Sequence, residues 1–191
     1  MNGWTIVVPF KAPLGRKTRL ASLYGPSKRA ELAAAWFAHV VDVAATFGFI
    51  TLLSPAEGAP DLDLFPPLTT WRQDFGRGLN AEVQALYDAL RPGRVAIVHA
   101  DLPTLSPGDM SVLLETAEIA GCAIASDRHG VGTNAIALAD GREFRFAFGP
   151  DSFAQHLAAG GPDCASVNRP GLARDIDTPD DARDLLPLCP R

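Results

Sequence analysis

Short apolar runs alternate with helix-forming segments along the first two thirds of the chain, and this order constrains the fold more than any other feature. The runs that predict buried strands are 5–8, 49–53, 95–98 and 122–125. The segments that predict helices between them are 27–48, 78–90 and 106–120. Strands separated by helices of this length pair in parallel, so the order predicts an α/β fold with a mostly parallel central sheet and helices on both faces.

Local signals mark the ends of these helices. Gly48 is expected to end the first helix, and Pro92–Gly93 the second. Ser106, Pro107 and Asp109 form a typical helix start, with a capping hydroxyl, a proline at the first position and an acid in the first turn.

The last third of the chain is richer in short strands. The strands expected there are 135–138, 144–148, 165–167 and 173–176, with a short helix at 152–159 and a final helix from Pro179. This arrangement predicts an antiparallel section near the carboxyl end. Residues 54–75 show little periodicity and are predicted to be a long irregular connection.

Bulk properties restrict the class of protein. A chain of 191 residues with 47% hydrophobic and 20% charged residues is expected to form a single domain, 1–191, with an ordinary core. A net charge of -5 argues against a general nucleic-acid binder. The three cysteines, Cys122, Cys164 and Cys189, are expected to be thiols. No signal peptide or membrane-spanning run is visible, so we expect a cytoplasmic protein with no membrane partner.

A basic loop follows the first predicted strand. Lys11, Arg16, Lys17 and Arg19 lie close together there in an otherwise acidic chain. A cationic loop at the carboxyl end of a strand suits a nucleoside triphosphate, although a solvated basic turn is the alternative. The loop contains neither a Walker P-loop nor a dinucleotide-binding glycine pattern, so side chains rather than backbone amides would have to meet the phosphate charge.

Three aspartates are candidate ligands of Mg²⁺. Asp101 follows the strand at 95–98, and Asp175 and Asp177 occupy alternate positions of the strand predicted at 173–176 and its end. Carboxylates on one face of a strand end can hold Mg²⁺ together with substrate phosphates, and Asp177 is the expected ligand of the pair. The alternative, which the local sequence alone favours, is that Asp177 or Thr178 caps the last helix.

Two polar segments are further candidates. Residues 127–134 contain two glycines and end in Thr133 and Asn134, which suits close approach to a ligand; an ordinary hairpin loop is the alternative. Residues 148–153 place Ser152 at a helix start, where it could bind a phosphate or simply cap the helix. Spacing assembles no Ser-His-Asp or Cys-His group.

Taken together, these segments resemble one family. The matching pieces are Val-Pro-Phe-Lys at 8–11, Lys-Thr-Arg-Leu at 17–20, Gly-Leu-Asn-Ala at 78–81, Asp-Leu-Pro at 101–103, Gly-Thr-Asn-Ala at 132–135, Phe-Gly-Pro-Asp-Ser-Phe at 148–153 and Asp-Ile-Asp-Thr-Pro at 175–179. The chain is similar to the guanylyltransferases of coenzyme F420 biosynthesis, the group typed by 2-phospho-L-lactate guanylyltransferase. The double glycine that opens the related molybdenum-cofactor guanylyltransferases is absent.

The resemblance implies a GT-A-like nucleotidyltransferase fold and a reaction in which GMP passes from GTP to a phosphorylated three-carbon acid, with release of pyrophosphate. The implied acceptor is 2-phospho-L-lactate, phosphoenolpyruvate or 3-phospho-D-glycerate, and the implied cofactor is Mg²⁺. A transferase with another phosphate acceptor and a non-catalytic nucleotide-binding module are the alternatives. No nucleic-acid partner is expected, and a homodimer stays open beside a monomer.

The resemblance also implies roles for individual residues. Those expected to act in catalysis are Lys11, Arg19 and Asp101. Those expected to bind substrates are Lys11, Lys17, Arg19, Asn80, Thr133, Gly149 and Ser152. Those expected to hold the metal are Asp101, Asp175 and Asp177.

Overall fold

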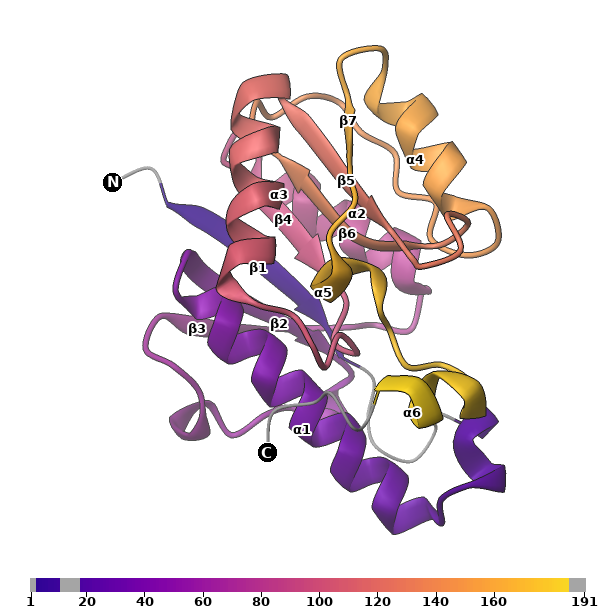
Figure 1. Ribbon diagram of the computed structural model, residues 1–191. Helices are drawn as coiled ribbons and strands as arrows, with labels where there is room; N and C mark the ends of the chain where they lie inside the picture. Colours follow the sequence, from indigo (N-terminus) through magenta and orange to yellow (C-terminus); the bar gives the residue numbers. More distant parts are fainter. Residues whose placement is uncertain (1–2, 11–17, 186–191) are drawn as a thin grey trace.

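The computed structural model describes residues 3–10 and 18–185. They form one seven-stranded sheet in the order β3-β2-β1-β4-β6-β5-β7, with helices on both of its faces (Figure 1). The strands are β1 (Trp4–Pro9), β2 (Gly48–Ser54), β3 (Thr69–Gln73), β4 (Val95–Val98), β5 (Cys122–Ser126), β6 (Thr133–Leu138) and β7 (Ala165–Val167).

Most neighbouring strands run in parallel. The exception is β6, which is antiparallel to both β4 and β5. The predicted mostly parallel sheet with an antiparallel section toward the carboxyl end is therefore confirmed. The connection from β1 to β2 contains a helix, as the sequence order predicted, and parallel neighbours require a crossover connection of this kind.

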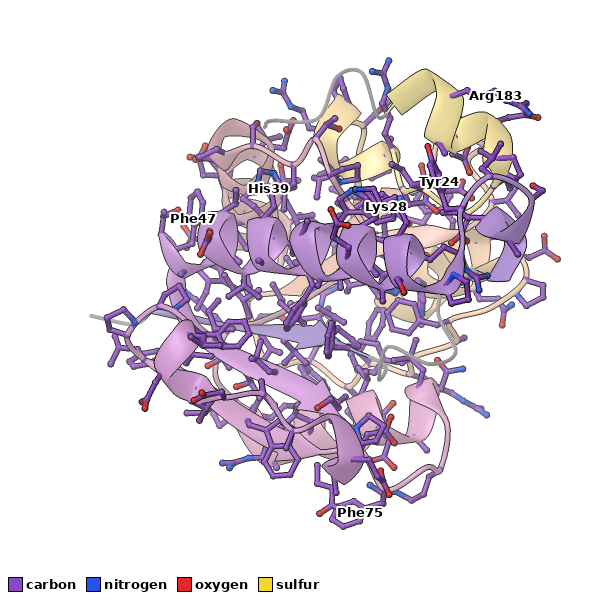
Figure 2. All side chains as sticks on the ribbon, turned by 90° about the horizontal axis from the view of Figure 1, so that it is seen from below. Tyr24, Lys28, His39, Phe47, Phe75 and Arg183 are labelled. Atoms are coloured by element: carbon purple, nitrogen blue, oxygen red, sulfur yellow. A yellow bond between two sulfur atoms is a disulfide. The ribbon has the colours of Figure 1, made fainter. Side chains whose placement is uncertain are left out.

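Helices cover the two faces in separate sets. The helices are α1 (Pro26–Ala45), α2 (Leu79–Leu90), α3 (Pro107–Ala120), α4 (Ser152–Gly160), α5 (Pro170–Ala173) and α6 (Pro179–Leu185), and the short 3₁₀ helices are η2 (Thr18–Ser22), η3 (Ala56–Gly58) and η4 (Leu62–Leu64). In β1, Ile6 and Val8 pack in the core under α1 and α3, and Val7 packs in the core under α2. This alternation is what a strand buried on both faces requires. Figure 2 shows α1 lying along the sheet, with Lys28 toward its first turn and Phe47 just beyond its end.

The predicted end of the first helix is wrong in detail. Helix α1 ends at Ala45, and Gly48 begins β2 instead. A Cβ at position 48 would overlap the backbone of Trp4, which is the register partner of Gly48 in β1. Gly48 is therefore required by the close approach of two strands rather than by a helix cap.

The connection predicted at 54–75 contains a strand that the sequence did not indicate. Strand β3 forms the edge of the sheet and pairs with β2 alone among the described strands. Its sequence, Thr-Thr-Trp-Arg-Gln, lacks an apolar run because an edge strand is largely exposed to solvent. The hydrophobic pattern used to find the buried strands could not find this one.

Two segments predicted as strands are not strands. In residues 144–148, Phe144 and Phe146 are buried, but the backbone amides bond to side chains of other elements rather than to a neighbouring strand. These bonds run from Phe146 N–H to Gln84 Oε1 (3.2 Å), from Ala147 N–H to His156 Nε2 (2.8 Å) and from Phe148 N–H to Asn80 Oδ1 (2.7 Å). Residues 173–176 begin in α5 and continue as irregular chain.

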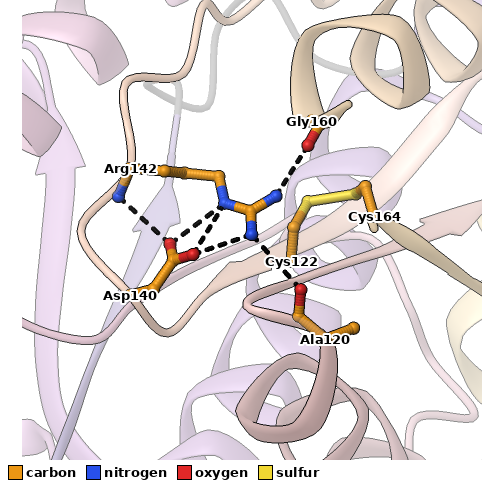
Figure 3. The surroundings of a disulfide bond; sticks show 6 residues. All are labelled: Ala120, Cys122, Asp140, Arg142, Gly160 and Cys164. Atoms are coloured by element: carbon orange, nitrogen blue, oxygen red, sulfur yellow. Dashed lines mark hydrogen bonds and ion pairs between the residues drawn. A yellow bond between two sulfur atoms is a disulfide. The ribbon is translucent and has the colours of Figure 1, made fainter. Parts of the chain in front are cut away.

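The expectation that the cysteines are thiols is wrong for two of them, because the structure joins Cys122 and Cys164 in a disulfide with the Cα atoms 4.6 Å apart (Figure 3). The pairing follows from strand register. Ala123 in β5 lies beside Ala165 in β7, so the residues that precede them are neighbours as well. The sequence separation of 42 residues concealed this. Beside the disulfide, Arg142 bonds to Asp140 and to two backbone carbonyls.

Among the described residues, none of the helices combines the length and the apolar character needed to cross a membrane.

Candidate active site

The chemistry-bearing segments meet at one end of the sheet. Strands β1 and β4 are parallel neighbours, so their carboxyl ends lie at the same end of the sheet. The basic loop begins there at Pro9, and the segment after β4 leads to Asp101. Strand β6 is antiparallel to β4 and therefore starts there. A backbone bond of 3.0 Å from His99 N–H to the carbonyl of Asn134 joins the two. The carboxyl end of the parallel strands is where open α/β sheets bind ligands.

Asp101, Asp175 and Asp177 come together at this end of the sheet. Each offers one carboxylate oxygen, and the three oxygens lie within 4.8 Å of one another. The strand expected to align Asp175 with Asp177 does not exist. Instead, Ile176 donates its N–H to the carbonyl of Asp101 (3.3 Å), which places one aspartate on each side of that anchor.

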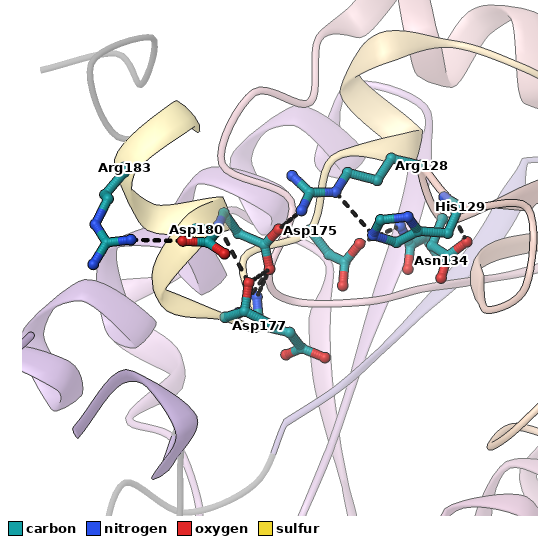
Figure 4. A network of polar contacts seen from close by, with 10 residues as sticks. Arg128, His129, Asn134, Asp175, Asp177, Asp180 and Arg183 are labelled. Atoms are coloured by element: carbon teal, nitrogen blue, oxygen red, sulfur yellow. Dashed lines mark hydrogen bonds and ion pairs between the residues drawn. The ribbon is translucent and has the colours of Figure 1, made fainter. Parts of the chain in front are cut away.

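Asn134 fixes the position of Asp175. Its side-chain amide donates to Asp175 Oδ1 (3.1 Å) and to the carbonyl of Leu172 (3.0 Å), and the asparagine itself is buried. The sequence placed Asn134 in a polar loop without assigning it this role. Figure 4 shows it in the same network as Asp175 and Asp177.

Ionisation of Asp175 is unfavourable in this setting. Burial, the charge of Asp101 and the charge of Asp177 raise its pKa to about 6, and the hydrogen bond from Asn134 only partly opposes them. Three carboxylates that repel one another and offer only oxygen ligands match the donor set of Mg²⁺ or a similar hard divalent cation. The residues present therefore fit a metal site.

The alternative that Asp177 or Thr178 caps the last helix is confirmed for Thr178. The residue that caps α6 is Thr178, whose hydroxyl accepts the N–H of Asp181 (3.3 Å). Asp181 in turn accepts the N–H of Thr178 (2.6 Å), which completes a reciprocal cap. Asp177 contributes a carboxylate to the cluster, and the capping signal and the candidate metal signal in Asp-Ile-Asp-Thr-Pro belong to different residues.

The glycine-containing loop at 127–132 is the hairpin loop of β5 and β6, as the simpler alternative held. Asp127 Oδ1 accepts the N–H groups of His129 (3.1 Å) and Val131 (2.9 Å). A Cβ on Gly132 would come within 2.8 Å of the Asp127 carboxylate, so this glycine makes room for that turn.

Thr133 is buried and bonded to a histidine that the sequence analysis did not single out. His156 Nε2 accepts the N–H of Ala147, so Nδ1 carries the proton and donates to Thr133 Oγ1 (2.9 Å). Burial, with the nearby His99, lowers the pKa of His156 to about 4, and the ring is therefore neutral at pH 7. The hydroxyl proton of Thr133 is left available for another acceptor.

The other expected substrate-binding residues lie on or beside the segment that leads into α4. Asp151, with φ 55°, occupies the N-cap position of α4, so Ser152 is the first helical residue and is 2% exposed. Gly149 has φ 136°, which favours glycine. Asn80 both donates to and accepts from the backbone of Phe148, and so holds this segment in place.

A surface hollow of about 600 Å³ lies beside this segment. Asn80, Arg145 and Gln155 are among the residues that line it. None of the three clustered carboxylates does. Lys11 and Lys17 lie outside the described residues, and so does the side chain of Arg19.

The chain is similar to a family of transferases over nearly its whole length. The family model described as "Guanylyl transferase CofC like" matches residues 4–185. Phosphoenolpyruvate guanylyltransferase of Streptomyces avermitilis is 34% identical, and the alignment covers 97% of this chain and 89% of that protein. The enzyme of the same name from Rubrobacter xylanophilus is 35% identical, with coverage of 94% and 91%.

Solved structures share the fold at low identity. A Desulfovibrio desulfuricans G20 protein, provisionally described as a nucleotide-diphospho-sugar transferase, has a TM-score of 0.72 at 19% identity and covers 93% of this chain and 84% of its own. The 2-C-methyl-D-erythritol 4-phosphate cytidylyltransferase of Thermus thermophilus has a TM-score of 0.57 at 17% identity, covering 98% of both. A Mycobacterium tuberculosis H37Rv protein in complex with manganese has a TM-score of 0.53 at 19% identity, covering 97% of this chain and 98% of its own. The expected nucleotidyltransferase fold is confirmed.

Proposed function

Because the chain belongs to the guanylyl transferase CofC-like family, and is accordingly a nucleotidyltransferase, we propose that it transfers GMP from GTP to a phosphorylated three-carbon acid and releases pyrophosphate. The proposed acceptors are 2-phospho-L-lactate, phosphoenolpyruvate and 3-phospho-D-glycerate, and the proposed pathway is coenzyme F420 biosynthesis. The relatives from Streptomyces avermitilis and Rubrobacter xylanophilus are named for phosphoenolpyruvate, which favours that acid among the three.

The observation that carries this proposal is the convergence of Asp101, Asp175 and Asp177 at the end of the sheet where the basic loop begins. A phosphoryl-transfer site must hold a triphosphate and a second phosphate close together, so it needs both a cation site and cationic side chains. The cluster supplies the first, and we assign the second to Lys11, Lys17 and Arg19.

The proposed cofactor is Mg²⁺, held by Asp101, Asp175 and Asp177. When bound, such an ion neutralises and orients the phosphates around the reacting phosphorus. The manganese complex of the Mycobacterium tuberculosis protein of this fold supports a divalent cation in general terms. Asn134 would hold Asp175 in place for that role, because its amide bonds only one of the carboxylate oxygens.

The residues of the chain would act by position and charge. The attacking phosphate of the acceptor is already an anion, so no strong general base is required. We assign Lys11 and Arg19 to the phosphates of GTP, and Asn80, Thr133, Gly149 and Ser152 to substrate binding. The hydrogen bond from His156 turns the oxygen of Thr133 into an acceptor and leaves its O–H to donate toward an anionic acid.

The remaining parts of the proposal concern the whole chain. We treat residues 1–191 as one nucleotidyltransferase domain, because the described residues share one sheet. We also propose a cytoplasmic location for the protein. The net charge of -5 supports the absence of a nucleic-acid partner, and a homodimer stays a prediction.

The direct test is pyrophosphate release by the full chain with GTP, Mg²⁺ and each of the three acids in parallel. We expect release with at least one acid, none without an acid, and faster release with GTP than with ATP at subsaturating nucleotide. Equal rates with GTP and ATP would remove the guanylyl assignment. If none of the three acids supports release, the acceptor must belong to another class of phosphate compound.

A change at Ser152 tests the acceptor subsite. If Ser152 holds the acid, Ser152→Ala should lower kcat/KM for the acceptor and leave the KM for GTP nearly unchanged. The expected loss of transition-state stabilisation is about 1.5–3 kcal/mol, the cost of one hydrogen bond to a charged group. Initial rates with each substrate varied in turn measure this. A lower melting temperature with an unchanged acceptor KM would make Ser152 a residue of the α4 packing only.

A further inference from the structure

Asp181 lies four residues after Asp177, and its carboxylate is not one of the three in the cluster. One of its oxygens, Oδ2, accepts three hydrogen bonds. They come from the N–H of Asp177 (3.0 Å), the N–H of Thr178 (2.6 Å) and the hydroxyl of Thr178 (2.8 Å). Asp181 is 4% exposed, so this is a buried, fully engaged carboxylate rather than a surface acid.

Two of the contacts of Asp181 go to residues outside the reciprocal cap that it forms with Thr178. A capping box uses the bond from the N–H of Thr178 to the acid at the third helical position. The bond from Asp177 N–H lies outside α6 and fixes the peptide that carries the proposed metal ligand. The second of these contacts is an ion pair between Asp181 Oδ1 and Arg128.

Arg128 reaches Asp181 from a different part of the fold. It lies in the loop between β5 and β6, which Asp127 holds through the N–H groups of His129 and Val131. Arg128 also donates from Nε to His129 Nε2 (3.1 Å). Figure 4 shows the guanidinium directed from this loop toward the start of α6, beside Asp175 and Asp177. The ion pair therefore ties the segment of Asp177 to the sheet.

The start of α6 is also packed from its other side. Ala182 and Ile176 form a small apolar cluster with Leu20 of η2 and Trp36 of α1. The segment from Ile176 to Ala182 is thus held by apolar contacts on one side and by the Arg128 ion pair on the other. Between these two supports lies Asp177, whose carboxylate must meet those of Asp101 and Asp175.

We propose that Asp181 and Arg128 are positioning residues that hold the backbone of Asp177 so that its carboxylate completes the metal site. The inference rests on the proposed function, because it assumes that Asp177 is a metal ligand. Removing a residue that orients a metal ligand typically lowers metal affinity by about 10–100-fold. The hydrogen bonds of Asp181 involve a charged group and are therefore stronger than bonds between neutral groups.

The test measures binding of Mn²⁺ alone to the full chain, by isothermal titration calorimetry or by electron paramagnetic resonance of free Mn²⁺. Asp181→Ala should raise the dissociation constant by about 10–100-fold. Arg128→Met, which leaves the cap of α6 intact, should raise it by about 3–10-fold. The matched control is Asp180→Ala, because Asp180 lies in the same turn but is exposed and pairs with Arg183. Its dissociation constant should stay within twofold of wild type.

A conservative variant separates positioning from general damage. Asp181→Glu keeps a carboxylate at the third helical position and should recover Mn²⁺ affinity to within about fivefold of wild type. Thermal melting shows whether each variant is folded at the temperature of the titration. If Asp181→Ala is unfolded there, Arg128→Met decides the question.

The outcomes distinguish this inference from the proposed function. If Asp177→Asn loses Mn²⁺ binding while folded Asp181→Ala and Arg128→Met bind as wild type does, the positioning role is wrong and the metal site stands. If Asp177→Asn binds Mn²⁺ as tightly as wild type, both the metal assignment and the positioning role are overturned.

Discussion

Replacing Asp101 with asparagine is expected to lower kcat for pyrophosphate release by at least about a hundredfold. Asparagine keeps the shape of the side chain but removes one of the three negative charges that converge at the end of the sheet. If the cluster holds the cation that neutralises the phosphates, that loss weakens cation binding and leaves the transition-state charge poorly compensated. The measurement is the initial rate at saturating GTP and acceptor over a range of Mg²⁺ concentrations.

Asp42→Asn is a suitable control for this experiment, because Asp42 is an exposed aspartate of α1, away from the cluster. It should retain wild-type activity. A fully active Asp101→Asn protein that still requires Mg²⁺ would show that the metal is held elsewhere. The same comparison with Asp177→Asn tests the member of the pair that we expect to be a ligand.

Replacing Asp175 with asparagine should change activity and stability in opposite directions. Activity should fall by at least about a hundredfold, as for Asp101. The metal-free protein should become more stable, because burial and the neighbouring carboxylates raise the pKa of Asp175 to about 6, above its ordinary value of 3.8. Asparagine still offers an oxygen to the amide of Asn134, so the local hydrogen bond is kept.

The sign of the pH dependence follows from the raised pKa. The unfolded chain ionises Asp175 near pH 4, but the folded protein resists ionisation until about pH 6, so stability falls as the pH rises through this window. At pH 7.5 the charged Asp175 should cost the metal-free protein about 1–3 kcal/mol. The variant should then melt about 2–10 °C above wild type in the presence of EDTA. The difference should shrink as the pH falls toward 5.

Added Mg²⁺ completes this experiment. It should raise the melting temperature of wild type at pH 7.5, because a ligand that binds only the folded state stabilises it. The melting temperature of Asp175→Asn should change little. A variant that melts below wild type in EDTA at pH 7.5, and that still responds to Mg²⁺ as wild type does, would contradict the view that carboxylate repulsion at this site is relieved by a cation.

Much of the fold could be predicted because its main strands are buried on both faces. Strands of that kind are apolar runs, and the helices between them carry local end signals such as Ser106 and Asp109, which the structure confirms as a capping box. Strand β3 escaped because an exposed edge strand has no such run. The segment 144–148 was wrongly predicted as a strand because its buried phenylalanines resemble one, while its amides bond to Asn80, Gln84 and His156.

The candidate site divides in the same way. Asp101, Asp175 and Asp177 could be named from the sequence, since each stands near the end of an apolar segment and together they match a family motif. The residues that hold them could not. Asn134 contacts Asp175 across 41 positions, and Arg128 meets Asp181 across an even longer stretch of chain. Nothing local in the sequence indicates either contact.

The sequence alone therefore determined the elements with strong local or periodic signals, the family resemblance, and which carboxylates are candidates for a metal. Hydrophobic period and helix caps act within a few residues, so they can be read along the chain. Only the tertiary structure decided that the three carboxylates meet, that Thr178 rather than Asp177 caps α6, and that Cys122 lies beside Cys164. These features depend on strand order and on contacts between distant segments, which form only when the chain is folded.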